Sequence, residues 1–295
     1  MIWAKEETLS RAEIEAIQLE KLKKVVSTVY EKVAPYRAKM DEAGIKPEDV
    51  KSLNDLKRLP FTTKQDMRDN YPFGLFAVDK SQLARIHASS GTTGKPTVVG
   101  YTKKDLETWA ECVARLAVAG GAESSDVCQI CFGYGMFTGA LGLHNGLERI
   151  GACIIPSSTG NTEKQIMYMK DYGTTLLVAT PSYALRIREV ATQMGLNPKT
   201  DLKLKTALVG SELLTEAMRD EMHKLYGDNL TITQNYGMSE LIGPGVSGEC
   251  TELCGMHINE DHFLAEIIDP ETGEVLPAVE NGVLVVTFLS KEALP

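Results

Sequence analysis

Residues 87–102 read HASSGTTGKPTVVGYT, a stretch that combines clustered hydroxyl groups, glycines and a lysine. A nucleotide hydrolase of the P-loop class requires Gly, four further residues, and then Gly-Lys followed by Ser or Thr. Here Ser89 stands where the first glycine belongs, and Pro96 replaces the hydroxyl residue after Lys95. The β-branched and aromatic residues after Pro96 favour a strand over the helix that a P-loop opens. The stretch therefore predicts a loop between two strands, and it disfavours a P-loop kinase or ATPase.

The composition of this loop suits the binding of a polyphosphate such as that of ATP. Small residues let backbone amides approach an anion, and hydroxyl groups and a lysine add further donors. An ordinary hairpin turn, in which Ser and Thr serve solvation, is the alternative. The candidate phosphate-binding residues are Ser89, Ser90, Gly91, Thr92, Thr93, Gly94 and Lys95.

The composition of the chain excludes several classes of protein. It has 295 residues, of which 43% are hydrophobic and 24% charged, as is typical of a soluble globular protein. A net charge of -9 argues against a nucleic-acid binder that works by neutralising phosphates. No run approaches the roughly 20 apolar residues of a membrane helix, and the N-terminus does not resemble a signal peptide. We therefore expect a cytoplasmic protein with reduced cysteines, without a membrane or nucleic-acid partner.

The order of predicted elements indicates an α/β fold. Residues 1–80 form a helical segment in which Ser10 and Glu13 can build a capping box and Pro35 should interrupt a long helix. Residues 81–295 form the core, in which short apolar strands alternate with amphipathic helices. This alternation predicts mostly parallel sheets flanked by helices. From residue 240 onward strands and turns predominate, so a small antiparallel part is expected at the C-terminal end.

Several motifs resemble those of the acyl-adenylate-forming (AMP-binding) superfamily, and most closely its phenylacetate-coenzyme A ligase branch. They occur in the order that this branch shows, and together they extend over nearly the whole chain. The resemblance implies the N-terminal large domain of an adenylate-forming enzyme. Besides the glycine-rich loop, the matching motifs are LPFTTKQDMRDNYPFGLFAV (59–78), FGYGMFTGALG (132–142), IPSSTGNTEKQ (155–165), ATPSYAL (179–185), NYGMSELIGPGV (235–246) and EDHFLAEIIDPETGEVLP (260–277).

The resemblance also implies a reaction and a set of nucleotide contacts. Such ligases join an acid to ATP as acyl-AMP and then transfer the acyl group to coenzyme A, with Mg²⁺ as cofactor. By this match Tyr236 would stack on adenine, Ser239 would donate to the α-phosphate, and Glu240 would hold Mg²⁺. Lys95 and Glu240 are then the catalytic candidates, although an isolated glutamate of this kind is also common on a surface loop. The remaining nucleotide candidates are Gly210, Ser211, Glu212, Asn235, Gly237 and Met238.

The acyl pocket is expected to take phenylacetate or a related aryl acid. Tyr134 and Phe137 correspond to the aromatic segment that contacts the acid in the resembling enzymes, and Gly243 and Pro244 would form another wall. Aromatic edges and the space left by glycines suit a flat ring. The alternative is that these aromatic residues belong to the core.

Cys250, Cys254 and His257 form a C-x3-C-x2-H pattern. Thiolates and imidazole suit a structural Zn²⁺, but such an ion takes four ligands and this pattern offers three. Cysteines of a reduced protein also pack as small hydrophobic residues. The pattern therefore has two interpretations, zinc binding and simple packing of the cysteines.

The last residues, TFLSKEALP, precede the point where the resembling ligases continue into a ribose-binding motif and a small C-terminal domain. We expect this lid domain to be absent, so that the chain is C-terminally truncated. Two interpretations follow: a ligase core that works in a full-length form or with a separate chain supplying the missing domain, or a catalytically incompetent fragment that binds a nucleotide or a partner. A homodimer through the N-terminal helices is a further expectation.

Overall fold

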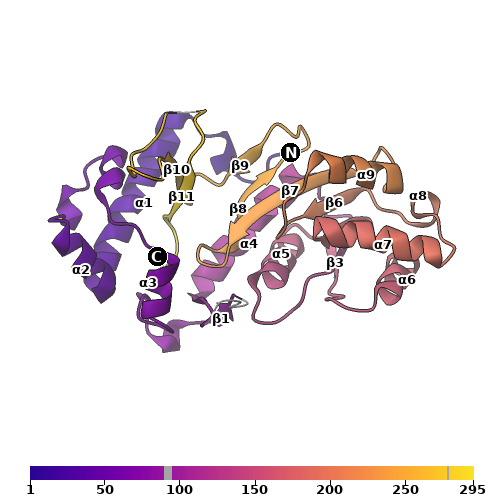
Figure 1. Cartoon of the computed structure of the whole chain (residues 1–295), viewed down its shortest axis with the longest axis horizontal. Helices are drawn as coiled ribbons and strands as arrows, with labels where there is room; N and C mark the ends of the chain where they lie inside the picture. The colour runs from indigo at the N-terminus through magenta and orange to yellow at the C-terminus, as the bar shows by residue number, and fades with distance from the viewer. Residues whose placement is uncertain (90–94, 278) are drawn as a thin grey trace. The chain divides into compact units, whose positions relative to one another are not determined.

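The computed structural model describes residues 1–89, 95–277 and 279–295. The chain divides into two compact units (Figure 1). Unit 1 comprises Met1–Ala4 and Trp109–Ile258, and unit 2 comprises Lys5–Thr108 and Asn259–Pro295. Within the described residues, no helix combines the length and apolar character needed to cross a membrane.

Unit 1 is built on a seven-stranded sheet with the order β4-β3-β5-β6-β7-β8-β9. The strands from β4 to β7 pair in parallel, and β8 and β9 extend the sheet in antiparallel fashion. The short buried runs of β5 and β6 are typical of strands that are covered on both faces. The strands are β3 (Val127–Ile130), β4 (Cys153–Ile155), β5 (Leu176–Ala179), β6 (Thr206–Val209), β7 (Thr231–Met238), β8 (Gly243–Glu249) and β9 (Met256–Ile258).

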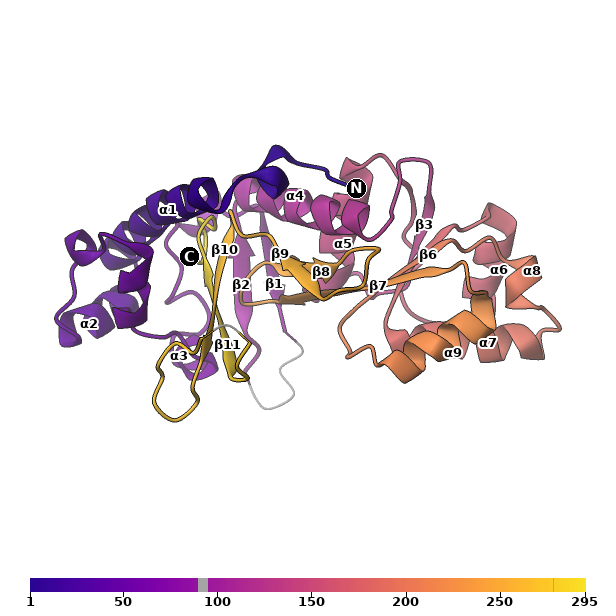
Figure 2. The same cartoon turned by 90° about the horizontal axis from the view of Figure 1, so that it is seen from above.

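Helices cover both faces of this sheet. Figure 2 shows α4 and α5 on one side of the strands and α7 and α9 on the other. On the second side Ile166, Ile187 and Met222 pack with strand residues such as Leu177 and Ala207 in one buried cluster. The helices are α4 (Lys103–Ala119), α5 (Thr138–Arg149), α6 (Thr162–Tyr172), α7 (Pro181–Gln193), α8 (Pro198–Asp201) and α9 (Glu216–Tyr226).

The strand order creates a switch point between β3 and β5. The chain leaves β3 through α5 toward β4 at the edge, whereas it leaves β5 through α7 toward β6 on the other side. In open α/β sheets, ligands bind beyond the carboxyl ends of the strands at such a point. A ligand site is therefore expected at the segments that follow β3, β5, β6 and β7.

Unit 2 combines helices with two antiparallel strand pairs. Ser10 and Glu13 form the predicted capping box of α1, Pro35 lies in the first turn of α2, and Thr63 caps α3. The elements are α1 (Arg11–Lys32), α2 (Ala34–Glu42), α3 (Lys64–Asp69), the 3₁₀ turns η1 (Lys5–Thr8), η2 (Pro47–Asp49), η3 (Leu53–Arg58) and η4 (Lys80–Gln82), and the strands β1 (Arg85–Ala88), β2 (Val98–Tyr101), β10 (Phe263–Ile268) and β11 (Val283–Phe288).

The two strand pairs of unit 2 confirm two details of the sequence prediction. The glycine-rich loop connects β1 to β2, which pair antiparallel, so no helix follows Pro96. Strands β10 and β11 form the expected antiparallel part. In the turn after β10, Asp269 Oδ1 accepts hydrogen bonds from the amides of Glu271 and Thr272. The predicted α/β class, with mostly parallel strands, flanking helices and a C-terminal antiparallel part, is thus confirmed.

Helices α4 and α5 approach closely because α5 carries glycines where α4 carries bulky side chains. A Cβ atom added at Gly142 would lie 2.2 Å from the indole of Trp109, which is fully buried. One turn later, a Cβ at Gly146 would lie 2.3 Å from the side chain of Val113. Since cores are packed without spare volume, these glycines set the distance between the two helices.

We expect Gly142→Ala to lower the free energy of unfolding by about 1–2 kcal/mol. Overpacking costs roughly 1–3 kcal/mol, and the better helix propensity of alanine returns up to about 1 kcal/mol. Denaturant titration measures the change. Gly135→Ala is the matched control, because a Cβ there meets no atom within 4 Å, and it should change stability by less than about 0.5 kcal/mol. Equal stabilities of the two variants would contradict this account of the helix pair.

Candidate functional site

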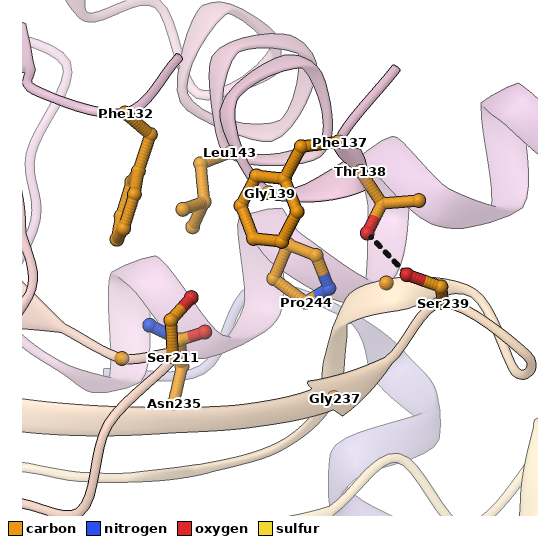
Figure 3. Close-up of a pocket in the computed structure, with 12 residues that line it drawn as sticks. Phe132, Phe137, Thr138, Gly139, Leu143, Ser211, Asn235, Gly237, Ser239 and Pro244 are labelled. Atoms are coloured by element: carbon orange, nitrogen blue, oxygen red, sulfur yellow. Dashed lines mark hydrogen bonds between the residues drawn. The ribbon is translucent and has the colours of Figure 1, made fainter. Parts of the chain in front are cut away.

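A cavity of about 210 Å³ lies in unit 1 beyond the carboxyl ends of β3 and β6. Strand β7, the start of β8 and the first turns of α5 complete its walls. Figure 3 shows Phe132, Leu143 and Phe137 across from Ser211 and Asn235, so one wall is apolar and the other polar. The lining residues are Phe132, Phe137, Thr138, Gly139, Leu143, Gly210, Ser211, Asn235, Gly237, Ser239, Gly243 and Pro244.

The floor of the cavity depends on glycines where β7 and β8 meet. The pairing register shifts between Tyr236 and Gly237, as in a β-bulge. A Cβ atom at Gly237 would lie 1.8 Å from the carbonyl oxygen of Gly243, a distance that no side chain tolerates. Gly243 itself has φ +95°, in the region that favours glycine. The two backbones therefore touch without side chains between them.

The polar wall is held by hydrogen bonds between β7 and the segment after β6. Asn235 is only 7% exposed, and its Nδ2 donates to the carbonyl of Val209 at 2.9 Å. Gly210 packs so tightly against Asn235 that a Cβ there would lie 2.9 Å from its amide. The next residue, Ser211, has φ +66°, which is uncommon for a residue other than glycine. Glu212 accepts from Gln234 Nε2 through its carbonyl at 3.0 Å, so the segment Val209–Glu212 is fixed to β7 at both ends.

Two hydrogen bonds fix the turn that follows β7. The hydroxyl groups of Thr138 and Ser239 lie 3.1 Å apart and join the start of α5 to this turn (Figure 3). Trp109 Nε1 donates to the carbonyl of Pro244 at 2.7 Å, which joins α4 to the start of β8. The helix residues of both bonds, Thr138 and Trp109, are buried. Ser239 is therefore presented at a defined place in the cavity wall.

The apolar wall comes from the segment between β3 and α5. The rings of Phe132 and Phe137 have centroids 6.3 Å apart and are tilted by 48°. Phe132 is buried, whereas Phe137 is 41% exposed. The hydroxyl of Tyr134, between them in the sequence, lies 3.1 Å from His144 Nδ1 on α5. Burial raises the pKa of Tyr134 well above its usual value, so its phenol stays protonated.

Most of the predicted site residues of unit 1 meet at this cavity. Those that line it are Phe137, Gly210, Ser211, Asn235, Gly237, Ser239, Gly243 and Pro244. The lining does not include Tyr134, Glu212, Tyr236, Met238 or Glu240. Phe132, Thr138, Gly139 and Leu143 are lining residues that sequence reasoning did not single out. The first three lie in the quoted motif 132–142, and Leu143 follows Gly139 by one helical turn, which is the signal that could have found it.

Tyr236 and Glu240 lie close to the cavity in the chain without lining it. Tyr236 is in β7 opposite Ser247 of β8, and Glu240 is in the turn after Ser239. Burial, together with the negative charge of Glu240, raises the pKa of Tyr236.

The described ends of the glycine-rich loop belong to unit 2. Residues 90–94, which include the candidates Ser90, Gly91, Thr92, Thr93 and Gly94, lie outside the described residues. Ser89 closes the base of the loop: its amide donates to the carbonyl of Thr97, and its Oγ accepts from the amide of Thr97, both at 3.0 Å. Lys95 Nζ lies 5.1 Å from the ring centroid of Tyr71, within the range of a cation–π contact.

The predicted zinc ligands are only partly brought together. His257 Nε2 lies 3.3 Å from Cys250 Sγ across β8 and β9, whereas Cys254 Sγ donates to the carbonyl of Glu252. The described residues include no group of three or more His, Cys, Asp and Glu side chains suited to a metal ion. A structural zinc takes four ligands, so zinc binding at this hairpin stays a prediction.

Comparison with known proteins agrees with this geometry. A sequence model of the AMP-binding enzyme family matches residues 4–287. The phenylacetate-coenzyme A ligase of Thermus thermophilus is 51% identical over 290 residues, which are 98% of this chain and 64% of that protein. The ligase of the same name from Escherichia coli K12 is 48% identical over 98% of this chain and 66% of its own length. The chain thus spans about two thirds of the length of these curated relatives.

A solved structure extends the likeness to three dimensions. The crystal structure of an open conformation of 2-hydroxyisobutyryl-CoA ligase, in complex with 2-HIB-AMP and CoA, aligns with a TM-score of 0.92 at 26% identity. The alignment covers 98% of this chain and 69% of that one. The family match covers nearly all of the sequence, and the fold and the order of the motifs agree with it. The chain therefore belongs to the family of AMP-binding enzymes.

Proposed function

We propose that this chain is the core of an ATP-dependent acid–thiol ligase that activates phenylacetate, or a related aryl acid, as acyl-AMP for transfer to coenzyme A. The observation that supports this most directly is the cavity of unit 1, which has an aromatic wall facing a polar one at the carboxyl ends of the sheet. About half of the residues are identical to those of proteins named phenylacetate-coenzyme A ligase.

The apolar wall is the proposed binding site of the aryl ring. Phe132, Phe137 and Leu143 offer two ring faces and an aliphatic side chain, and Pro244 adds a further apolar surface. Aromatic pairs prefer offset or edge-to-face contacts, and the tilt of Phe132 against Phe137 leaves such faces to a third ring. A cavity of about 210 Å³ has room for a single aromatic ring.

The polar wall is proposed to bind the adenylate. Ser239 would donate its hydroxyl proton to an α-phosphate oxygen, and Thr138 would orient that hydroxyl. Gly210, Ser211, Glu212 and Asn235 would contact the adenine, and Tyr236 would stack on it, beside Gly237 and Met238. The residues Ser89–Lys95 of unit 2 would supply donors to the phosphates, with Lys95 as their cation.

The proposed first step joins two anions. A carboxylate oxygen of the acid bonds to the α-phosphorus of ATP, and the bond from that phosphorus to the bridging oxygen of pyrophosphate breaks. Preorganised donors lower such a barrier by stabilising the charge that develops, which is the role proposed for Ser239 and Lys95. Mg²⁺ is usually held by one or two carboxylates and the substrate phosphates, so the single carboxylate of Glu240 fits it; when bound, the ion would neutralise phosphate charge. The thiol of coenzyme A then replaces AMP at the acyl carbon.

A ligand panel tests the proposal, because a ligand that binds the native state raises its stability. With MgATP present, phenylacetate should raise the midpoint of thermal unfolding by several degrees, since a concentration of 100 Kd adds about 2.7 kcal/mol. Pyrophosphate exchange dependent on phenylacetate should accompany the shift. Nucleotide binding without any response to aryl acids would instead support a nucleotide-binding module, and release of ADP would contradict adenylate formation.

Leu143→Ala should shift the acid preference toward larger rings. The substitution removes side-chain volume from the apolar wall, so a fused ring such as 2-naphthylacetate should gain affinity while phenylacetate loses about fivefold or more, as expected for one to two lost methylene contacts. Calorimetric titration of both acids measures the change. Leu213→Ala is the matched control, because Leu213 is 74% exposed and does not line the cavity. The same preference in both variants would contradict the proposed ring site.

Glu240→Gln should weaken the Mg²⁺ dependence of nucleotide binding. The change removes one negative charge and keeps the shape of the side chain, and loss of even an outer partner of a metal costs about 10–100-fold in affinity. Titration of Mg²⁺ at fixed ATP should therefore show a midpoint at least about tenfold higher. Glu163→Gln on the exposed side of α6 provides the control. An unchanged midpoint would remove Glu240 from the metal site.

A further inference from the structure

The loop between β3 and α5, residues 131–137, carries both aromatic side chains of the apolar wall, and a residue at its middle contacts α5. Phe132 and Phe137 line the cavity. The residue halfway between them, Tyr134, does not line it and instead directs its hydroxyl to α5. This hydrogen bond joins the loop to the helix at a point between Phe132 and Phe137. Tyr134 therefore contributes a contact that holds the loop carrying the two rings.

Tyr134 contacts His144 in two ways. Its hydroxyl lies 3.1 Å from Nδ1, and the two rings meet edge to face, with centroids 5.8 Å apart and an angle of 90°. The other ring nitrogen, Nε2, lies 3.4 Å from a carboxylate oxygen of Glu148, one turn further along α5. When Nε2 carries the proton and donates to Glu148, Nδ1 accepts the proton of the phenol. The three side chains then form one continuous chain of hydrogen bonds.

The helix that receives this contact is itself fixed. Gly142 lies against the buried indole of Trp109, and Thr138 bonds to Ser239. The same helix supplies Leu143, adjacent to His144, to the apolar wall. The Tyr134–His144 contact thus joins the loop of the apolar wall, which has no regular structure, to the helix that carries Leu143 of the same wall.

We propose that His144 is a positioning residue of the aryl-acid site, which holds the 131–137 loop through Tyr134 and is oriented by Glu148. This inference rests on the proposed function, since it concerns the binding of the same acid. His144 touches no substrate in this arrangement; it sets the spacing between the Phe132 and Phe137 rings. Without the bond the loop gains freedom, and a ligand must restrict it again on binding, which lowers affinity. A flat aryl acid should lose more than a flexible aliphatic acid, because the latter adapts to displaced rings.

The test compares variants by calorimetric binding of phenylacetate, hexanoate and ATP to the whole chain. Tyr134→Phe removes the hydroxyl, and His144→Phe keeps a ring against Tyr134 while removing both hydrogen bonds. Each should weaken phenylacetate binding about five- to tenfold, equivalent to one lost hydrogen bond, and should leave the ATP affinity unchanged. The ratio of phenylacetate to hexanoate affinity should fall. The double variant should lose no more than either single one, since both changes break one bond.

Two further variants separate positioning from general stability. Tyr183→Phe removes a phenol of the same unit that bonds to Gly160 and Thr162 rather than to α5, and it should leave phenylacetate affinity unchanged. His144→Gln retains an amide that can bond to Tyr134 and should restore most of the affinity. Additive losses in the double variant, or wild-type affinity in Tyr134→Phe, would overturn the positioning role while leaving the proposed function intact. Absence of phenylacetate binding to the unaltered chain would overturn both.

Discussion

The contact of two bare backbones at Gly237 and Gly243 is the constraint on which the site depends. Any side chain at Gly237 would collide with the carbonyl of Gly243, so β8 can return along β7 only while both positions lack side chains. This return places Pro244 where Trp109 can bond to its carbonyl, and it places Ser239 where Thr138 can reach it. Close packing of the β7 and β8 backbones thus shapes this cavity wall. The same packing positions Ser239 and the carbonyl of Pro244.

Helix α5 transmits this constraint to the apolar wall. Its glycines let it approach α4, its first residue bonds to the turn after β7, and its middle carries Leu143 and His144. A helix is stiff along its length, so anchors at residues 138 and 142 also fix residues 143 and 144. Helix α5 therefore helps to position wall residues that come from distant parts of the sequence.

Much of the fold could be predicted from local pattern, because strands such as β5 and β6 are short buried runs and helices such as α1, α3 and α9 begin at a side-chain cap. Thr138, Thr162 and Lys103 begin helices at the residues where the pattern changes. The site was predictable only where a motif is contiguous, as in residues 235–244. Leu143 could be found only once Gly139 was known to line the cavity, and Phe132 depends on how the chain turns after β3, which periodicity does not describe. Tyr134 was expected at the acid, but its hydroxyl finds a partner ten residues later in the chain.

The separation of ring wall and polar wall has a consequence for how an acid is oriented. An aryl ring gains free energy by leaving water, whereas a carboxylate loses hydration unless donors replace it. In the proposed ligase, a cavity with phenylalanines on one side and polar side chains on the other would satisfy both demands with the ring against Phe132 and Phe137 and the carboxylate toward Ser239. The reverse orientation would bury a charge against apolar side chains, which costs several kcal/mol. In the proposed ligase, the two walls would therefore favour an acid with an apolar ring and would direct its carboxylate away from that ring wall.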